Sequence, residues 1–195
     1  MKLAVLASGE GTNLQAIIDS INSGYLKNVT IRYVVSDKAD ARAVKRAKDN
    51  NITVIIINKK DMVDKLRIVF REVDLVVLAG FLKIIPPELI GEKLIINLHP
   101  SLLPLFGGKG MYGLKVHEEV IKSGMKVSGC TVHIVTESID NGPIIIQKCI
   151  DVRDDDTPES LQERIHELEH EAMVEAIKKL GENNYKIVNN KIIFN

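Results

Sequence analysis

Short apolar runs alternate with helical segments along this chain, and this alternation restricts the fold more than any other feature of the sequence. Residues 2–7, KLAVLA, form a continuous apolar run, which is typical of a strand covered on both faces of a sheet. Residues 14–21, LQAIIDSI, then carry apolar side chains at helical spacing. Repeated strand–helix–strand units predict an α/β fold with a doubly wound, mostly parallel sheet and helices on both faces.

The same reasoning predicts further strands and helices. The expected strands are residues 30–36, 53–58, 74–80, 94–99, 129–135 and 143–150, and the expected helices are residues 39–50, 61–73, 114–124 and about 157–180. Asp40 is a plausible N-cap of the second helix, and Thr157-Pro158 is a start signal for the long one. Residues 185–194 are expected to form a terminal hairpin that turns at Asn189-Asn190.

Composition excludes several classes of partner. The formal net charge is zero, basic and acidic residues are mixed, and Trp is absent, so we expect no nucleic-acid binding. Cys130 and Cys149 lack a CxxC pattern and are expected to be two buried thiols in a reducing cytosol. The apolar run at residues 75–82 is shorter than the ~20 residues of a membrane span. Residues 1–7 are too short for a signal peptide, so we expect a cytoplasmic protein without membrane contact.

The loop SGEGTN, residues 8–13, follows the first expected strand and opens the first expected helix. Thr12, with Gln15 three residues later, fits a capping box, and the free N–H groups of such a helix start bind anions. Leu14 occupies the third glycine position of a dinucleotide fingerprint, so a monophosphate is favoured over a pyrophosphate. A plain tight turn is the alternative. Asp37 is interpreted as a solvated loop aspartate rather than a ribose ligand.

The segment INLHPSLLP, residues 96–104, ends a strand with two polar side chains. Ligands of doubly wound sheets bind at the carboxyl ends of the strands. Asn97 and His99 are two residues apart and therefore point to the same face, where an amide and an imidazole can stabilise an oxyanion. A hydrogen-bonded surface histidine is the alternative. Ser101 has no evident triad arrangement, so acyl-enzyme chemistry is not indicated.

Asp140 precedes Asn-Gly and is either a turn former or a carboxylate that orients His99 and raises the pKa of its imidazole. His133 is flanked by apolar residues in a strand and is interpreted as structural. His166 and His170 are four residues apart on a helix, but the HExxH motif is absent, and we expect no metal site.

Several motifs together resemble the folate-dependent phosphoribosylglycinamide formyltransferase family. They keep the family's order and spacing over nearly the whole chain, and they are SGEGTNLQAI (8–17), VVLAGFLKI (76–84), NLHPSLLP (97–104), GCTVHIV (129–135) and DNGPII (140–145). The resemblance implies a single formyltransferase domain over residues 1–195, with a Rossmann-like nucleotide-binding half at about 1–100 and a second half at about 101–195.

The resemblance also implies roles for individual residues. The catalytic residues are Asn97, His99 and Asp140; the ribonucleotide ligands are Gly11, Thr12, Asn13 and Glu169; the folate ligands are Lys60, Leu82, Lys83, Ile84, Ile85 and Asn97. Some members have arginine at the positions of Lys83 and Lys60, and proline is common at the position of Gly107.

The implied reaction is transfer of the formyl group of 10-formyltetrahydrofolate, as co-substrate, to the amine of glycinamide ribonucleotide in purine biosynthesis and one-carbon metabolism. Protonated His99 and the Asn97 amide would stabilise the oxyanion, and Asp140 would keep His99 charged. The partners are then small molecules, without a metal or a nicotinamide, and the protein is a monomer or a homodimer.

Four other functions compete with this interpretation, and one of them, a transfer-RNA formyltransferase, is disfavoured because those relatives carry a second, C-terminal domain. A formyltetrahydrofolate hydrolase would use the same Asn–His–Asp set, but those relatives carry an additional domain in front, and the first strand is expected here at residue 2. A nicotinamide enzyme is disfavoured by Leu14, and a passive nucleotide-binding module is disfavoured by the polar strand end.

Overall fold

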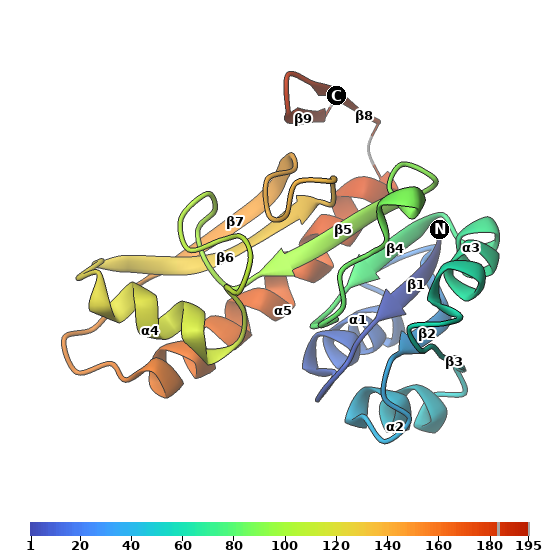
Figure 1. The fold of residues 1–195 in the computed structure, drawn as a ribbon, viewed down its shortest axis with the longest axis horizontal. Helices are drawn as coiled ribbons and strands as arrows, with labels where there is room; N and C mark the ends of the chain where they lie inside the picture. The colour runs from blue at the N-terminus through green and yellow to red at the C-terminus, as the bar shows by residue number, and fades with distance from the viewer. Residues whose placement is uncertain (183, 195) are drawn as a thin grey trace. The chain divides into compact units, whose positions relative to one another are not determined.

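The computed structural model describes residues 1–182 and 184–194 (Figure 1). Its contacts divide the chain into two compact units, an N-terminal unit of residues 1–97 and a C-terminal unit of residues 98–195. A single formyltransferase domain over residues 1–195 stays a prediction.

The N-terminal unit is built on parallel strands. They follow the order β3-β2-β1-β4-β5, with bounds β1 Lys2–Leu6, β2 Thr30–Ser36, β3 Thr53–Ile56, β4 Leu75–Leu78 and β5 Leu94–His99. Each neighbouring pair in this order is parallel, and Val5 of β1 lies between Val34 of β2 and Val77 of β4. The side chains of residues 3–6 are fully buried, which is why this central strand is apolar at every position rather than at alternate positions.

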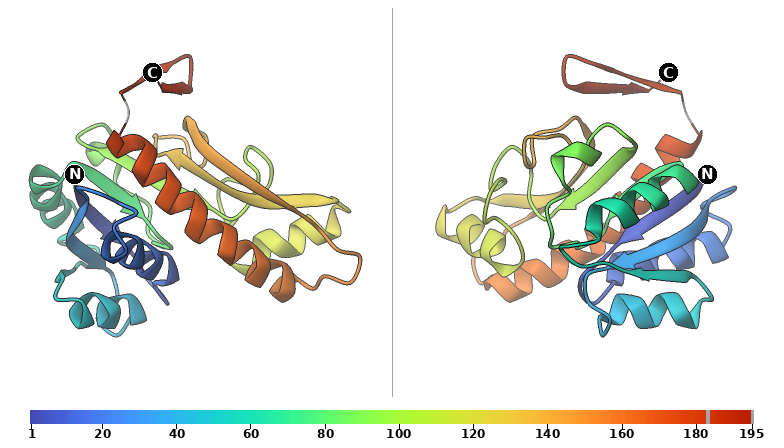
Figure 2. Two further views of the ribbon diagram at one scale, coloured as in Figure 1. Left: turned by 180° about the vertical axis from the view of Figure 1, so that it is seen from behind. Right: turned by 45° about the vertical axis from the view of Figure 1, so that its right-hand side comes forward.

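Helices cover both faces of this parallel sheet. They are α1 Thr12–Asn22, α2 Arg42–Asp49 and α3 Met62–Glu72, followed by the short 3₁₀ helix η1 Pro87–Leu89. In Figure 2, α1 lies in front of the strands in the left view, whereas α3 lies in front of them in the right view. The predicted α/β fold, with its mostly parallel, doubly wound sheet, is confirmed.

Two predicted helix caps are wrong. The N-cap of α1 is Gly11, in the left-handed conformation at φ 70°, and it makes no side-chain capping bond. The Gln15 side chain does not reach back to the loop but donates to Asp19 Oδ1 at 2.8 Å. Helix α2 starts after Ala41 rather than at Asp40, also without a side-chain cap. A glycine with positive φ can end the loop without a side-chain oxygen, because it turns the chain directly into the first helical residue.

The C-terminal unit pairs an antiparallel hairpin with two helices. Strands β6 Val127–Ile134 and β7 Ile144–Asp151 are antiparallel, and the helices are α4 Leu114–Lys122 and α5 Pro158–Glu182. Helix α5 packs along β6 and β7 and also contacts α4, as the left view of Figure 2 shows for the orange-red helix. Thr157 accepts a bond at Oγ1 from the Ser160 amide at 3.2 Å, so the predicted start of the long helix is confirmed.

The chain ends in a second hairpin, β8 Tyr185–Val188 and β9 Lys191–Phe194, whose strands are antiparallel. Asn189 and Asn190 form its turn at φ 50° and 59°. Positive φ at both central residues is the requirement of a type I′ turn, and asparagine tolerates it. The predicted terminal hairpin is therefore confirmed.

Helix α4 carries a buried histidine that is not one of the predicted site residues. His117 is buried, and neither of its ring nitrogens has a hydrogen-bond partner among the described residues. Burial, followed by the charges of His166 and His99, lowers the pKa of His117 from 6.5 to about 4. The protonated imidazole is therefore disfavoured in the folded chain.

This burial predicts an acid-sensitive fold. The unfolded chain takes up a proton at His117 near pH 6.5, whereas the folded chain does so only near pH 4, so acid favours unfolding in this window. We expect His117 to remove up to about 3 kcal/mol of stability between these pH values. His117→Leu should flatten the pH dependence of urea unfolding by this amount. Equal slopes for the variant and the wild type from pH 6.5 to 4 would contradict the assignment.

Candidate active site

Two polar side chains end β5, as the sequence predicts. Asn97 is half-buried, and His99, at the last strand position, is 4% exposed. Alternate residues of a strand point to the same face, so the amide and the imidazole lie on one face of β5. A buried imidazole needs partners for both ring nitrogens, and other residues of the C-terminal unit, to which His99 belongs, supply them.

Both ring nitrogens of His99 face oxygen acceptors. Nε2 lies 2.8 Å from the carbonyl oxygen of Phe106, and Nδ1 lies 3.5 Å from Oδ2 of Asp140. Phe106 has φ 53°, a left-handed conformation that a large side chain seldom adopts. A carbonyl can only accept, so Nε2 donates to it, and Nδ1 is the nitrogen that faces the carboxylate. The predicted proximity of Asp140 and His99 is confirmed.

Asp140 is held from several sides in the loop between β6 and β7. Its Oδ2 accepts a hydrogen bond from the Gly108 amide at 2.9 Å, and its side chain is 11% exposed. Its Oδ1 lies 3.5 Å from Nε2 of His133, so one carboxylate contacts two imidazoles. The interpretation of His133 as purely structural missed this contact. A histidine in the strand that leads into the DNG loop was the available signal.

The pKa of His99 contradicts one prediction. Burial lowers the pKa of His99, the charge of Asp140 and the bond to Phe106 raise it, and the net direction is downward. The prediction that Asp140 raises the pKa of His99 is confirmed, whereas the prediction that it keeps His99 charged is wrong, because burial outweighs this effect. Burial raises the pKa of Asp140, but bonds from His133 and Gly108 and the charges of the two histidines together lower it. Asp140 is thus a carboxylate that partly offsets the burial of His99.

Gly107, where the family commonly has proline, lies beside the carboxylate. A Cβ atom at this position would meet the end of the Leu103 side chain at 2.5 Å and the Cβ of Asp140 at 3.2 Å. The glycine therefore lets the loop approach Asp140 closely. The replacement of the common proline by glycine therefore has a local structural reason in this chain.

The glycine loop of the N-terminal unit forms the start of α1. A Cβ atom on Gly11 would lie 2.8 Å from the Cα of Ala43, so a side chain does not fit there. Arg46 braces the loop from α2 by donating to the Glu10 carbonyl at 2.9 Å and to Gln15 Oε1 at 3.0 Å. The first turn of any helix leaves backbone N–H groups free for an anion. The loop geometry therefore supports the predicted phosphate site, and sequence reasoning missed Arg46.

Replacing Thr12 tests this phosphate site. Because Thr12 is the first residue of α1 and not its cap, we expect Thr12→Ala to leave the free energy of unfolding nearly unchanged. We expect the dissociation constant of the ribonucleotide to rise about tenfold, since a bond to a charged group is lost. Calorimetric titration measures this, with Thr30→Ala on β2 as a matched control. An unchanged affinity would place the phosphate elsewhere.

The predicted folate residues follow β4 in the N-terminal unit. Leu82 and Ile84 are 58% and 71% exposed, whereas Ile85 is buried. The Leu82 amide donates to Ser8 Oγ at 3.0 Å, which ties this segment to the loop after β1. Exposed apolar side chains that gather in one patch can mark a ligand-binding surface. Ile85 can contribute only its backbone, because its side chain belongs to the core.

Two basic residues complete the predicted folate set. The Lys60 amide donates to Asn58 Oδ1 at 2.8 Å in the turn before α3. Lys83 Nζ lies 3.5 Å from Oδ2 of Asp37, whose side chain is only 7% exposed. The interpretation of Asp37 as a solvated loop residue is therefore wrong, because this carboxylate is buried and paired with Lys83.

Glu169 lies on the buried side of α5, near the thiol of Cys130. Burial and the charge of Glu169 raise the pKa of Cys130 to about 12, so this thiol is unreactive at neutral pH. Cys149 is exposed, so the expectation of two buried thiols holds only for Cys130. The role of Glu169 as a ribose ligand stays a prediction.

No group of three or more His, Cys, Asp or Glu side chains within residues 1–182 and 184–194 could hold a metal ion. None of the helices in these residues combines the length and apolar character needed to cross a membrane.

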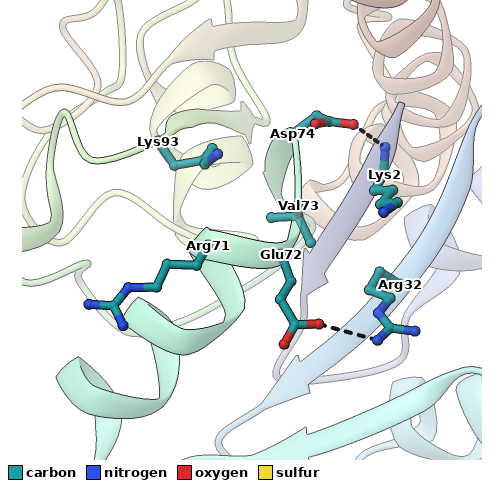
Figure 3. A pocket seen from close by; sticks show the side chains of 7 residues that line it. All are labelled: Lys2, Arg32, Arg71, Glu72, Val73, Asp74 and Lys93. Carbon is teal, nitrogen blue, oxygen red and sulfur yellow. Dashed lines mark hydrogen bonds and ion pairs between the residues drawn. The ribbon is translucent and has the colours of Figure 1, made fainter.

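One pocket lies away from the polar end of β5. It encloses about 370 Å³ in the N-terminal unit and is lined by Lys2, Arg32, Arg71, Glu72, Val73, Asp74 and Lys93 (Figure 3). Glu72 accepts a hydrogen bond from the Arg32 guanidinium, and Asp74 accepts one from the Lys2 amide, as the dashed lines in Figure 3 show. Lys2, Asp74 and Lys93 mark the amino ends of their strands, so this pocket lies at the opposite ends from Asn97 and His99.

Comparison with known proteins identifies the family. The family model described as formyl transferase matches residues 1–177. The chloroplastic phosphoribosylglycinamide formyltransferase of Vigna unguiculata is 44% identical over 194 residues, covering 93% of this chain and 61% of that protein. The Bacillus subtilis (strain 168) phosphoribosylglycinamide formyltransferase is 38% identical over 197 residues, covering 94% of this chain and 96% of that protein.

Comparison with solved structures identifies the same family. The crystal structure of glycinamide ribonucleotide transformylase 1 from Symbiobacterium toebii superposes with a TM-score of 0.90 at 35% identity, covering 100% of this chain and 93% of that chain. The present chain spans 61% of the length of the Vigna protein but 96% of the Bacillus protein. By sequence and by fold, this chain belongs to the formyl transferase family.

Proposed function

We propose that this chain transfers the formyl group of 10-formyltetrahydrofolate to the amine of glycinamide ribonucleotide, a step of purine biosynthesis. The observation that carries the proposal is the distance of 3.5 Å between His99 Nδ1 and Asp140 Oδ2. His99 follows Asn97 by two residues on β5. Relatives that cover this chain almost fully carry phosphoribosylglycinamide formyltransferase names, which supports the choice of substrates.

The chemistry requires stabilisation of a developing negative charge. When the ribonucleotide amine attacks the formyl carbon directly, charge accumulates on the formyl oxygen. The Asn97 amide is the donor for that oxygen, and such a donor is typically worth on the order of 3 kcal/mol in the barrier. A histidine whose pKa is lowered by burial can also accept the proton that the attacking amine must lose. Asp140 then stabilises the resulting imidazolium, which gives the proton to N10 of the folate when the bond between N10 and the formyl carbon breaks.

Substrate binding is assigned to the remaining site residues. Gly11, Thr12 and Asn13 bind the phosphate at the start of α1, and Glu169 contacts the ribose. On the folate side, the exposed side chains of Leu82 and Ile84 fit a flat apolar ring. The other folate contacts are Lys60, Lys83, Asn97 and the backbone of Ile85.

The protein acts on small molecules in this proposal, without nucleic-acid or membrane partners. We assign it to the cytoplasm, as a monomer or a homodimer, with a Rossmann-like nucleotide-binding half. The formyltetrahydrofolate hydrolase is the less favoured function, because the relatives named above are transferases.

Product analysis separates the two functions. The purified protein is incubated with 10-formyltetrahydrofolate, with and without glycinamide ribonucleotide, and both formate and formylated ribonucleotide are quantified. We expect folate turnover only when the ribonucleotide is present, with one formylated product per turnover. Formate release at the same rate without the ribonucleotide would identify a hydrolase instead.

A further inference from the structure

A buried hydroxyl group organises the loop between His99 and Phe106. Thr131, in the middle of β6, is 0% exposed and donates through Oγ1 to the Ser101 carbonyl at 2.7 Å. The same oxygen accepts from the Leu103 amide at 3.0 Å and from Gln147 Nε2 at 3.1 Å. A hydroxyl has one proton and two lone pairs, so these three bonds use its full capacity. Thr131 therefore fixes residues 101 and 103 at once.

Two further bonds extend this network along the loop. Gln147, directly opposite Thr131 on β7, also donates to the Leu103 carbonyl at 2.9 Å. Ser101 donates through Oγ to the Leu105 carbonyl at 2.6 Å, and it is buried. The residue after Leu105 is Phe106, whose left-handed backbone must be held by its surroundings. The network therefore leads, residue by residue, to the carbonyl that accepts from His99.

We propose that Thr131, supported by Gln147, is a positioning residue that sets the tautomer and orientation of His99 through the Phe106 carbonyl. The carbonyl holds the proton of the neutral imidazole on Nε2, 2.8 Å away. Nδ1 is then left facing Asp140, ready to take a proton. If the loop shifts, the carbonyl no longer selects Nε2, and the neutral imidazole can place its proton on Nδ1 toward the carboxylate instead.

A positioning role of Thr131 can be distinguished from a role in stability alone. A residue that only holds the fold changes stability without moving the proton of His99. A residue that acts through His99 changes the ring nitrogens of His99 first, and it loses its effect on rate when His99 is absent. The kinetic part of the proposal rests on the proposed formyl transfer, whereas the tautomer part needs no substrate.

The test uses three variants of the full-length protein. Thr131→Val keeps the branched shape but removes the hydroxyl, Thr131→Ser keeps the hydroxyl, and Gln147→Met removes the two donor bonds from β7. Ser123→Ala is the matched control, because it also removes a hydroxyl that donates to a carbonyl, that of Val120 at the end of α4. Thermal unfolding is recorded for every variant.

The direct measurement is the pair of ¹⁵N chemical shifts of the His99 ring during an NMR pH titration. We expect Nε2 to carry the proton in the neutral form of the wild type, Thr131→Ser and Ser123→Ala. We expect a mixture of tautomers in Thr131→Val and a smaller change in Gln147→Met. Shifts like those of the wild type in both Thr131→Val and Gln147→Met would overturn the proposal. If Thr131→Val does not fold, the result for Gln147→Met decides alone.

Kinetics provide the second measurement. We expect Thr131→Val to lower kcat about ten- to hundredfold, with little change in the KM of the ribonucleotide, because a misplaced catalytic group is costly in the transition state. In a His99→Ala background, the same substitution should have no further effect. An equal loss of rate in both backgrounds would assign Thr131 to general stability. If no variant or wild type transfers formyl groups, the proposed function fails while the tautomer result still stands.

Discussion

Replacing Asp140 with asparagine should slow formyl transfer by about a hundredfold or more, since a charge that stabilises the reacting imidazole is lost. Asparagine has the shape of aspartate and tolerates the left-handed backbone at φ 52° that Asp140 adopts. Its side-chain oxygen can still accept from the Gly108 amide. The substitution therefore removes the charge and leaves the loop in place.

The same substitution should lower the pKa of His99 further. Asp140 is the main influence that raises this pKa against burial, so its neutralisation leaves burial unopposed. An NMR titration of His99 measures the shift, and the affinity for the ribonucleotide should stay close to that of the wild type. Asp155→Asn, on the exposed loop before α5, serves as a matched control. An unmoved His99 titration would return Asp140 to the role of a turn former.

Replacing Asn97 with alanine should be nearly as damaging. The lost amide is the donor proposed for the formyl oxygen, and loss of such a donor typically costs about a hundred- to thousandfold in kcat. The loss should appear in kcat and not only in KM, because the bond strengthens as charge develops on the oxygen. Steady-state kinetics with both substrates measure this difference. A rise in the KM of the folate with an unchanged kcat would make Asn97 a binding residue alone.

The sequence predicted the strands and helices well, because their burial follows simple periodic patterns. The core strand at residues 2–7 and the hairpin at Asn189-Asn190 depend on local rules, namely apolar continuity and tolerance of positive φ. The caps at Thr12 and Asp40 failed for a different reason. A capping side chain needs a particular backbone conformation at its own position, and the left-handed Gly11 is not visible in a list of residue types.

The candidate site was predicted in part. Asn97 and His99 were found from the polar end of an apolar strand, and Asp140 from the family resemblance. The contact of His133 with Asp140 depends on the path of the loop between β6 and β7, which no spacing rule gives. The downward shift of the His99 pKa depends on burial, which requires the folded structure. Thr131 was missed because its role arises only when the loop after His99 folds back onto β6.

In the proposed mechanism, His99 and Asp140 act as one unit in formyl transfer. The most direct test is single-turnover formyl transfer by the wild type, His99→Ala, Asp140→Asn and the double variant, each verified as folded. Groups that act together lose their benefit together, so we expect the double variant to be about as slow as the slower single variant. If instead the two losses multiply in the double variant, the two residues act independently and the proposed coupling is wrong.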